Sequence, residues 1–231
     1  MTIELIPVEG IGEVRRGEDL ATLIADRASL RNGDVVVVTQ KVVSKVEGRL
    51  VPLDHDDPAA RLALVEEESV RVLRRRGELV ITETRHGFVC ANAGVDLSNV
   101  DAGWAALLPE DPDRSARRIR DGLRARTGAE VAVIVSDTFG RPWRQGVTDV
   151  AIGCAGVAAV VDLRGTEDDR GRTLQATEVC VADEIASAAD LVMGKAARVP
   201  VAIVRGVDAG WLRQGSVRAE VVRPPAEDLF R

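Results

Sequence analysis

The stretch Val131-Ala-Val-Ile-Val-Ser-Asp137-Thr138-Phe-Gly-Arg-Pro-Trp-Arg-Gln-Gly146 carries the strongest structural signal in the chain. Five apolar residues, most of them β-branched, open it and predict a buried strand. A carboxylate and a hydroxyl follow directly, at Asp137 and Thr138. Oxygen ligands at the end of a buried strand are well placed to hold a metal ion.

Gly140 and Pro142 predict that this strand then breaks and that a loop follows. From that loop we expect four side chains to project: Phe139, Arg141, Trp143 and Arg144. The same spacing is equally compatible with a solvated turn whose aromatic side chains fill the core and whose arginines lie in water.

The chain has 231 residues, enough for one large domain or two small ones. We expect a single domain over residues 1–231, with two lobes meeting near a linker-like segment at 109–114.

The net charge of −6 argues against nucleic-acid binding. No apolar run approaches the roughly 20 residues that cross a bilayer, so we expect no membrane partner. The start of the chain lacks a signal-peptide pattern, which predicts a cytoplasmic protein.

The cysteines, histidines and lysines are few. The three cysteines lie far apart among apolar neighbours, which predicts small core residues rather than a disulfide framework or a zinc site. The two histidines are too few and too distant for a histidine-based metal site. Of 31 basic residues only three are lysines, namely Lys41, Lys45 and Lys195. A chain that uses arginine so widely suggests that these lysines stand where a compact ammonium is needed.

Strands and helices interleave along the sequence, which predicts a mixed α/β fold. Apolar runs predict strands at 3–8, 35–38, 79–82, 88–90 and 200–204. Helices are predicted at 19–27, at 57–77, from 109–113 to about 126, and from about 185 to 194. A Gly-x-Gly at 10–12 lacks the third glycine of the dinucleotide fingerprint, and no Walker A motif is present. The Rossmann signal is therefore weak, and the usual marker of a phosphate-binding loop is missing.

Two helical segments carry charge patterns. In the helix predicted at 57–77, an acidic run at 66–68 and a basic run at 74–76 fit the helix dipole. If residues 39–49 are helical, Lys41 and Lys45 lie on one face. They then form either a two-pronged site for an anion or part of a solvated helix face.

A second polar loop follows the strand predicted at 88–90. It spans 91–100, is rich in small residues and contains Asp96 and Asn99. Such a loop either holds a ligand or forms local Asx turns. Asp96, Asp137 and Thr138 together supply hard oxygen ligands that suit Mg²⁺ or Mn²⁺. With the lysines as a positive counterpart, they suggest phosphoryl transfer.

With these residues assembled, the chain resembles the coenzyme F420:L-glutamate ligase family, CofE, and the N-terminal domain of the actinobacterial protein FbiB. The resemblance extends in order from Ile3 to about Phe230. It rests on four motifs: Val36-Val-Val-Thr-Gln-Lys-Val-Val-Ser-Lys-Val-Glu-Gly-Arg49, Gly94-Val-Asp-Leu-Ser-Asn99, Ser136-Asp-Thr-Phe-Gly-Arg-Pro-Trp-Arg-Gln-Gly146 and Ala182-Asp-Glu-Ile185.

This resemblance implies a GTP-dependent ligase that forms an amide bond. The carboxylate of a deazaflavin precursor would take the γ-phosphoryl group of GTP, and L-glutamate would displace phosphate from the acyl phosphate. Further glutamates could then be joined through γ-linkages. The implied cofactors are GTP as co-substrate and Mg²⁺ or Mn²⁺.

The family pattern also assigns roles to residues of this sequence. Asp96, Asp137 and Thr138 would hold two metal ions, with Asp137 and Lys45 central to catalysis. The nucleotide would contact Ile11, Gly12, Glu13, Val14, Gln40, Lys45 and Asn99. Glu178 and the Gly194-Lys195 region are weaker candidates. Charge and stacking suggest Arg141, Trp143 and Arg144 for the acidic, planar acceptor. Gly12 stands where the family usually has proline, which predicts a more flexible loop.

The fold that the resemblance implies is a mixed α/β arrangement particular to this family, neither a Rossmann nor a P-loop fold, in an intertwined homodimer. The resemblance to FbiB leaves two readings open: a stand-alone ligase, or the ligase part of a protein that continues into a flavin-binding domain. Two other functions also remain open. One is an amide ligase for a different carboxylate, and the other is a nucleotide- and metal-binding module that needs a partner domain.

Overall fold

The computed structural model describes residues 2–229, so the predicted domain limits at 1 and 231 and the end of the resemblance at Phe230 lie outside the described residues. The strands are β1 (Glu4–Pro7), β2 (Val35–Thr39), β3 (Leu50–Pro52), β4 (Ser69–Arg76), β5 (Leu79–Thr84), β6 (Val89–Ala91), β7 (Trp104–Ala106), β8 (Ala132–Arg141), β9 (Arg144–Ala155), β10 (Val161–Asp162), β11 (Glu178–Val179) and β12 (Val201–Arg205). The helices are α1 (Leu20–Ala25), α2 (Gln40–Glu47), α3 (Pro58–Glu67), α4 (Pro112–Thr127), α5 (Val181–Met193) and α6 (Val217–Glu220), with 3-10 turns η1 (Asn92–Gly94), η2 (Ala209–Trp211) and η3 (Pro225–Glu227).

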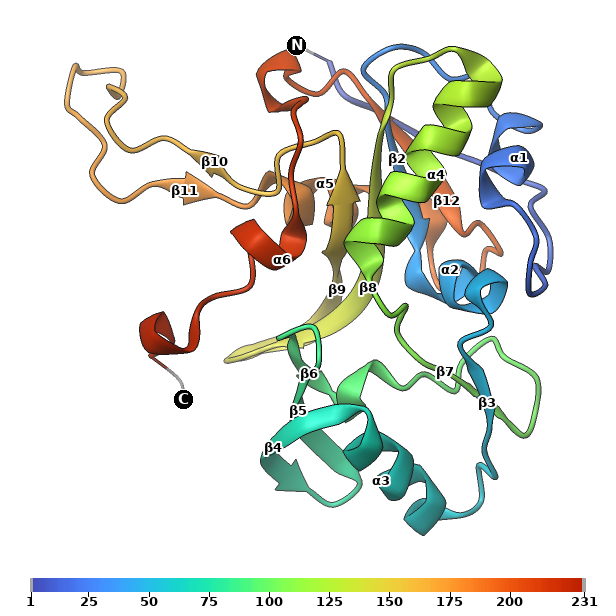
Figure 1. The fold of residues 1–231 in the computed structure, drawn as a ribbon. Helices are drawn as coiled ribbons and strands as arrows, with labels where there is room; N and C mark the ends of the chain where they lie inside the picture. The colour runs from blue at the N-terminus through green and yellow to red at the C-terminus, as the bar shows by residue number, and fades with distance from the viewer. Residues whose placement is uncertain (1, 230–231) are drawn as a thin grey trace.

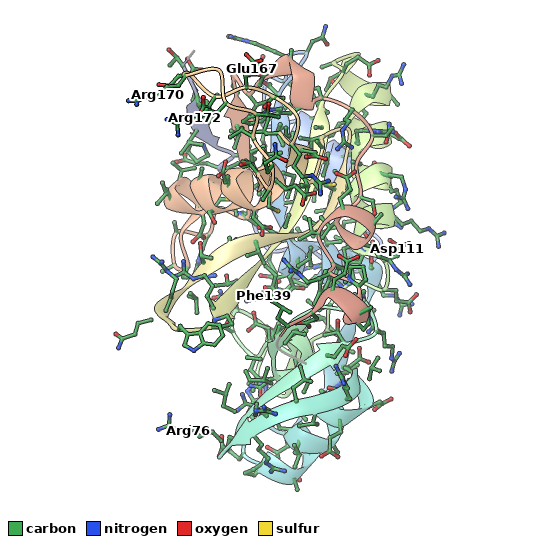
Figure 2. The ribbon with its side chains drawn as sticks, turned by 90° about the vertical axis from the view of Figure 1, so that its left-hand side faces the viewer. Arg76, Asp111, Phe139, Glu167, Arg170 and Arg172 are labelled. Atoms are coloured by element: carbon green, nitrogen blue, oxygen red, sulfur yellow. The ribbon has the colours of Figure 1, made fainter. Side chains whose placement is uncertain are left out.

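A mixed five-stranded sheet forms the centre of the molecule, in the order β1-β12-β2-β8-β9. β2 and β8 run parallel, and the other neighbours are antiparallel. The helices α4 and α5 cover opposite faces of this sheet (Figures 1 and 2). Strands covered on both faces need continuous apolar runs, as in the fully buried Val35–Val38 segment. The predicted mixed α/β class is confirmed.

A smaller unit lies at one end of the central sheet and contains α3, the β3–β7 pair and the β4-β5-β6 sheet (Figure 1). It has a separate apolar cluster that includes Leu53, Val65 and Val80. Phe139 of β8 lies between this unit and the central sheet (Figure 2). Its ring packs edge-on against Phe88, with centroids 6.2 Å apart.

The segment between β10 and β11 extends away from the rest of the molecule (Figure 1). Glu167, Arg170 and Arg172 are exposed along it (Figure 2). The polar, loop-like character predicted for residues 162–172 agrees with this excursion.

The strand neither ends before Asp137 nor breaks at Gly140, because β8 continues to Arg141 and pairs with β9 from Val133 onwards. The chain does turn at Pro142, as the proline predicted. Gly140 takes a place in this ladder opposite Val147, so it does not end the strand. The turn consists of Pro142 and Trp143 alone. Pairing with a second strand, which spacing in one segment cannot reveal, supplies the hydrogen bonds that keep the chain extended.

The helix predicted at 57–77 is also wrong in its second half. It ends at Glu67, and residues 69–76 form β4, which turns through Gly77 and Glu78 to pair with β5. Val70 and Val72 are β-branched and alternate with polar residues, a strand pattern that the helix-like charge runs obscured. The basic run 74–76 therefore lies on an exposed strand, and its helix-dipole interpretation fails.

The other helices agree more closely with the sequence. α4 begins behind Asp111, whose carboxylate accepts a hydrogen bond from Arg114 N at 2.9 Å, and ends at Gly128 with φ of 72°. The segment at 109–113 is not a solvated linker, since Pro109 and Asp113 are buried. Within residues 2–229, none of the helices has the length and apolarity needed to cross a membrane.

Candidate active site

Loops from several strands meet at one edge of the central sheet. β2 and β8 are parallel and in register at their ends, where Thr39 lies opposite Ser136. β12 starts at the same edge, because Thr39 N donates to the carbonyl oxygen of Pro200 at 3.0 Å. The carboxyl ends of parallel strands are where α/β sheets bind ligands. This edge carries the predicted site residues that follow β2 and β8.

Asp137 and Thr138 lie on the extension of β8, and neighbouring residues of a strand point to opposite faces. The Thr138 hydroxyl faces β9, where it donates to Asp149 Oδ1 at 2.6 Å. Asp137 therefore points to the other face of β8, and its charge interacts with Asp96, with Asp149 and with the thiol of Cys90. The edge thus offers two separate oxygen positions, one on each face of β8.

The carboxyl group of Asp137 is in surroundings that oppose its ionisation. Burial raises its pKa to about 7, although the backbone N–H of Thr138 acts in the other direction. The negative charges of Asp96 and Asp149 add to the rise in pKa. A bound cation would relieve this repulsion.

Asp96 already has a positive partner. Its Oδ2 lies 2.8 Å from Lys41 Nζ, and Lys41 also donates to the Ser98 hydroxyl at 2.7 Å. Burial alone would raise the pKa of Asp96, but Lys41 and the backbone N–H of Ser98 hold the pKa below its usual value. The 91–100 loop is therefore tied to α2 and brings Asp96 to the edge of the sheet.

Lys41 and Lys45 do not form a two-pronged anion site in the described chain. Each ammonium contacts a different carboxylate, Lys41 that of Asp96 and Lys45 that of Glu13. Lys45 is 8% exposed, whereas the Glu13 side chain is 74% exposed. The Glu13 contact places the 11–14 loop beside α2.

In the 11–14 loop, Ile11 and Val14 are buried in the core and anchor the loop at both ends. Their side chains cannot contact a nucleotide, so only their backbone groups remain available. Gly12 has φ of +70°, with open space where a Cβ would lie. Proline cannot adopt this φ, so glycine here permits a loop conformation closed to proline.

Gln40 begins α2 and is 1% exposed. The Ser44 hydroxyl lies 2.9 Å from Gln40 Oε1 and 2.6 Å from the carbonyl oxygen of Leu107, and its one hydrogen can serve only one of them. Within residues 2–229, Gln40 Nε2 has no hydrogen-bond partner. A buried polar atom without a partner needs an explanation, and a bound ligand is one.

Asn99 follows Ser98 in an exposed position, with φ of +53°. Asparagine tolerates this left-handed conformation better than most residues. Of the two alternatives for this loop, the structure shows the local Asx-type contact, from Ser98 N to Asp96, and ligand binding stays a prediction.

Arg141, Trp143 and Arg144 lie at the exposed tip of the β8–β9 hairpin, where Trp143 is 83% exposed. Arg141 follows Asp137 by four positions along the strand, about 13 Å of extended chain. The hairpin tip is thus held apart from Asp137 within one chain. Glu178 pairs with Arg164 at 3.2 Å in the β10–β11 excursion.

Two further side chains belong to the edge. Asp149 is 2% exposed and accepts the Ser136 hydroxyl at 2.9 Å as well as the Thr138 hydroxyl. Lys195 Nζ contacts Thr138 Oγ1 and lies 3.6 Å from Asp149 Oδ1. Sequence reasoning missed Asp149 because only the β8–β9 register places it opposite Thr138. Recognising the hairpin would have revealed it.

The oxygen ligands at this edge suit a hard divalent cation that keeps part of its water shell better than a metal enclosed by protein ligands alone. Within residues 2–229, no group of three or more histidine, cysteine, aspartate or glutamate side chains converges as a metal cage. Mg²⁺ usually takes one or two carboxylates and completes its shell with water and phosphate oxygens. Asp96, Asp137 and Thr138 fit that mode of binding.

The cysteines are not part of a ligand set. Cys90 and Cys154 are buried as predicted, and Cys180 is partly buried. Burial raises the pKa of each thiol to about 12, so all three remain protonated. They act as small side chains in the packing of the core.

Comparison with known proteins gives consistent matches. A family model described as F420-0:Gamma-glutamyl ligase matches residues 10–206. The coenzyme F420:L-glutamate ligase of Methanothermobacter thermautotrophicus is 44% identical over the full length of both chains. Its namesakes in Methanopyrus kandleri and Archaeoglobus fulgidus are 45% and 40% identical, over all of this chain and 98% and 97% of theirs.

Proposed function

Because the chain belongs to the F420-0:gamma-glutamyl ligase family, we propose that it joins L-glutamate to the carboxyl group of the coenzyme F420 precursor at the expense of GTP. The family identifies the chain as a ligase, so the resemblance drawn from its four motifs is confirmed. The nucleotide, the metal ions and the order of steps are the proposal. The single observation that supports them best is the electrostatic coupling of Asp137 to Asp96 and Asp149 at the carboxyl edge of the sheet, where Thr138 is bonded to Asp149.

A carboxylate has no viable leaving group, so it must be activated before an amine can attack it. In the first step, a carboxylate oxygen of the precursor attacks the γ-phosphorus of GTP, the bond to the bridging oxygen breaks, and GDP leaves. In the second step, the neutral amine of glutamate attacks the acyl carbon of the acyl phosphate. Phosphate leaves with the bonding electrons, the nitrogen loses a proton, and an amide results. Further additions would join glutamates through γ-carboxylates.

Asp96 and Asp137 would hold one Mg²⁺ or Mn²⁺ ion, and Thr138 would bind a second on the opposite face of β8. Such ions neutralise the phosphate oxygens of a bound nucleotide. The charge repulsion around Asp137 supports this assignment, because a cation removes it.

Nucleotide phosphates would meet Lys45 and the backbone of the 11–14 loop, including that of Gly12. The exposed Glu13 carboxylate would have to leave Lys45 when a phosphate takes its place. The unpaired Nε2 of Gln40 and the exposed Asn99 are the other expected contacts. These roles come from the family pattern. The burial of Lys45 beside the exposed carboxylate of Glu13 supports the role of Lys45 as a phosphate contact.

The acceptor is extended, with a planar deazaflavin ring remote from the carboxylate that reacts. The ring could therefore bind at the hairpin tip, to Arg141, Trp143 and Arg144, while the reacting carboxylate lies about 13 Å away, near Asp137. In a homodimer, which we also propose, the exposed hairpin could serve its own site or that of a second copy. Sedimentation of the purified chain would establish the oligomeric state, and a monomer at micromolar concentration would contradict the dimer.

The decisive experiment incubates the 231-residue chain with the glutamate-free precursor, L-glutamate, GTP and Mg²⁺ or Mn²⁺. Mass spectrometry then counts the added glutamyl residues. Product with GTP, but not with ATP or after chelation of the metal, would support the proposal. Metal-dependent GTP binding without product would instead favour a different acceptor or a missing partner domain, such as a flavin-binding one.

A further inference from the structure

Two of the three lysines of the chain touch residues that are expected to bind metal ions. Lys41 is held between Asp96 and Ser98, and its side chain is only 16% exposed. Lys195 precedes β12, contacts Thr138 Oγ1 with its ammonium group, and is 64% exposed. Lys41 is therefore enclosed by its partners, whereas Lys195 reaches the site only with the tip of its side chain.

The hydrogen bonds that Asp149 accepts explain why an ammonium group can contact the oxygen of Thr138. The buried carboxylate accepts the hydroxyl hydrogen of Thr138 through Oδ1 and that of Ser136 through Oδ2. Because the hydrogen of Thr138 is committed to Asp149, the lone pairs of Oγ1 face away from that carboxylate. An ammonium group is a pure donor and can contact such a lone pair. A divalent ion would need the same lone pair.

We propose that Lys195 is the resident cation of the Thr138 position, where its ammonium group takes the place of a divalent ion that can bind only after Lys195 has moved away. Asp149 is the positioning residue, since it turns the Thr138 oxygen towards whichever cation is present. The inference rests on the metal-binding role proposed for Thr138. It deepens that role by naming an internal competitor.

This competition couples metal and nucleotide binding. A displaced Lys195 remains tethered within one side-chain length of Thr138, so it is available to a phosphate oxygen of a nucleotide. A nucleotide that pairs with the displaced ammonium would therefore strengthen metal binding. By linkage, the metal would strengthen nucleotide binding by the same factor.

The test measures Mn²⁺ binding to the full chain without nucleotide, by electron paramagnetic resonance of the free ion. Lys195→Met removes the competing ammonium and is expected to bind one Mn²⁺ about tenfold more tightly than wild type. Lys195→Arg keeps the charge and should stay within about twofold of wild type.

Arg198→Met is the matched control, because it removes one positive charge from an exposed position on the same loop. Among residues 2–229, Arg198 has no hydrogen bond or ion pair. At about 0.15 M salt a charge without direct contact is largely screened, so this variant should bind Mn²⁺ within about twofold of wild type. Equal tightening by Arg198→Met and Lys195→Met would overturn the inference.

The experiment also separates this inference from the proposed function. If wild type binds Mn²⁺ and Lys195→Met binds no more tightly, the resident-cation role is wrong while the metal site stands. If neither protein binds Mn²⁺, both the metal site and the role of Lys195 are wrong. Tight binding that appears only in Lys195→Met would support the inference most strongly.

Discussion

At the scale of single residues, the site is built around a carboxyl group whose charge the fold disfavours. Asp137 is partly buried and close to two other carboxylates, and its pKa of about 7 lies well above that of an unfolded chain, about 3.9. As the pH rises from about 4 to 7, the unfolded chain releases this proton before the folded one does, so the folded state loses stability. A cation bound at Asp137 would compensate for this loss of stability.

Asp137→Asn is expected to abolish metal binding and turnover and to raise the thermal midpoint of the metal-free protein by a few degrees at pH 8. The amide keeps the size of the side chain and removes a charge that the fold disfavours. Turnover and thermal melting without metal test this prediction. Near wild-type turnover would refute the metal role, and a lower thermal midpoint would indicate a structural role.

Lys45→Met is expected to weaken GTP binding by about tenfold or more, the usual effect of losing a hydrogen bond to a charged group. Glu13→Gln removes the same ion pair from the other side and should not weaken GTP binding, because an exposed carboxylate contributes little and competes with phosphate. Calorimetric titration with GTP would measure both variants. Similar losses in both would mean that the ion pair, and not the lysine, matters.

At the scale of elements, α4 connects the site strand to the rest of the chain. Asp113 in its first turn is 6% exposed and accepts hydrogen bonds from Cys154 N at 2.8 Å, Val217 N at 3.0 Å and the Ser216 hydroxyl at 2.7 Å. A Cβ on Gly153 would lie 2.3 Å from the backbone of Pro112, so only glycine permits this approach. One carboxylate thus joins α4, β9 and α6.

Asp113→Ala is expected to lower the free energy of unfolding by about 3 kcal/mol or more, because several buried donors lose their acceptor. Asp111→Ala removes the exposed helix cap and a long, exposed ion pair to Arg117, and should cost about 1 kcal/mol. Urea denaturation would compare the two. Equal costs would mean that Asp113 does no more than cap the helix.

The predicted binding site of the precursor ring lies on the β8–β9 hairpin. Arg144→Ala is expected to raise the KM for the precursor several-fold and to leave the Kd for GTP unchanged, because the tip lies away from the proposed phosphate contacts. Arg170→Ala removes an exposed arginine from the β10–β11 excursion and controls for net charge. A loss of GTP affinity with an unchanged KM for the precursor would contradict the assignment.

At the scale of the whole molecule, the central sheet and the smaller unit are joined around His86. Its Nε2 donates to the carbonyl oxygen of Pro109 at 2.8 Å, and its ring stacks on Phe88 at 5.5 Å. Phe88 in turn packs against Phe139 of β8. Burial lowers the pKa of His86, because the charged ring would lose water, although the Pro109 carbonyl acts against this.

The contribution of His86 to stability is therefore expected to fall as the pH drops below about 6.5, because the unfolded chain binds a proton that folded His86 resists. This contribution opposes the gain in stability that the raised pKa of Asp137 gives over the same pH range. His86→Gln should remove this opposing contribution, so that between about pH 6.5 and 5.5 the free energy of unfolding rises more steeply on acidification than it does in wild type. His55→Gln makes the same substitution at an exposed histidine and should keep the wild-type slope. Identical slopes in wild type and His86→Gln would exclude His86 as the cause.

The sequence by itself determined the mixed α/β class, the family and the central elements. Continuous valines at 35–38 could only form a buried strand, and Asp111 and Gly128 marked the ends of α4 because caps act locally. The motifs also identified Asp96, Asp137, Thr138 and Lys45, whose roles remain predictions to be tested.

Only the tertiary structure decided how these residues meet. It extended β8 through Gly140 to Arg141 and turned residues 69–76 into a strand, since in both places the hydrogen bonds come from the next strand across a two-residue turn. It also brought the carboxylate of Asp149 and the ammonium group of Lys195 into contact with the hydroxyl of Thr138. Register and loop closure are relations between segments, so no stretch of sequence read alone contains them.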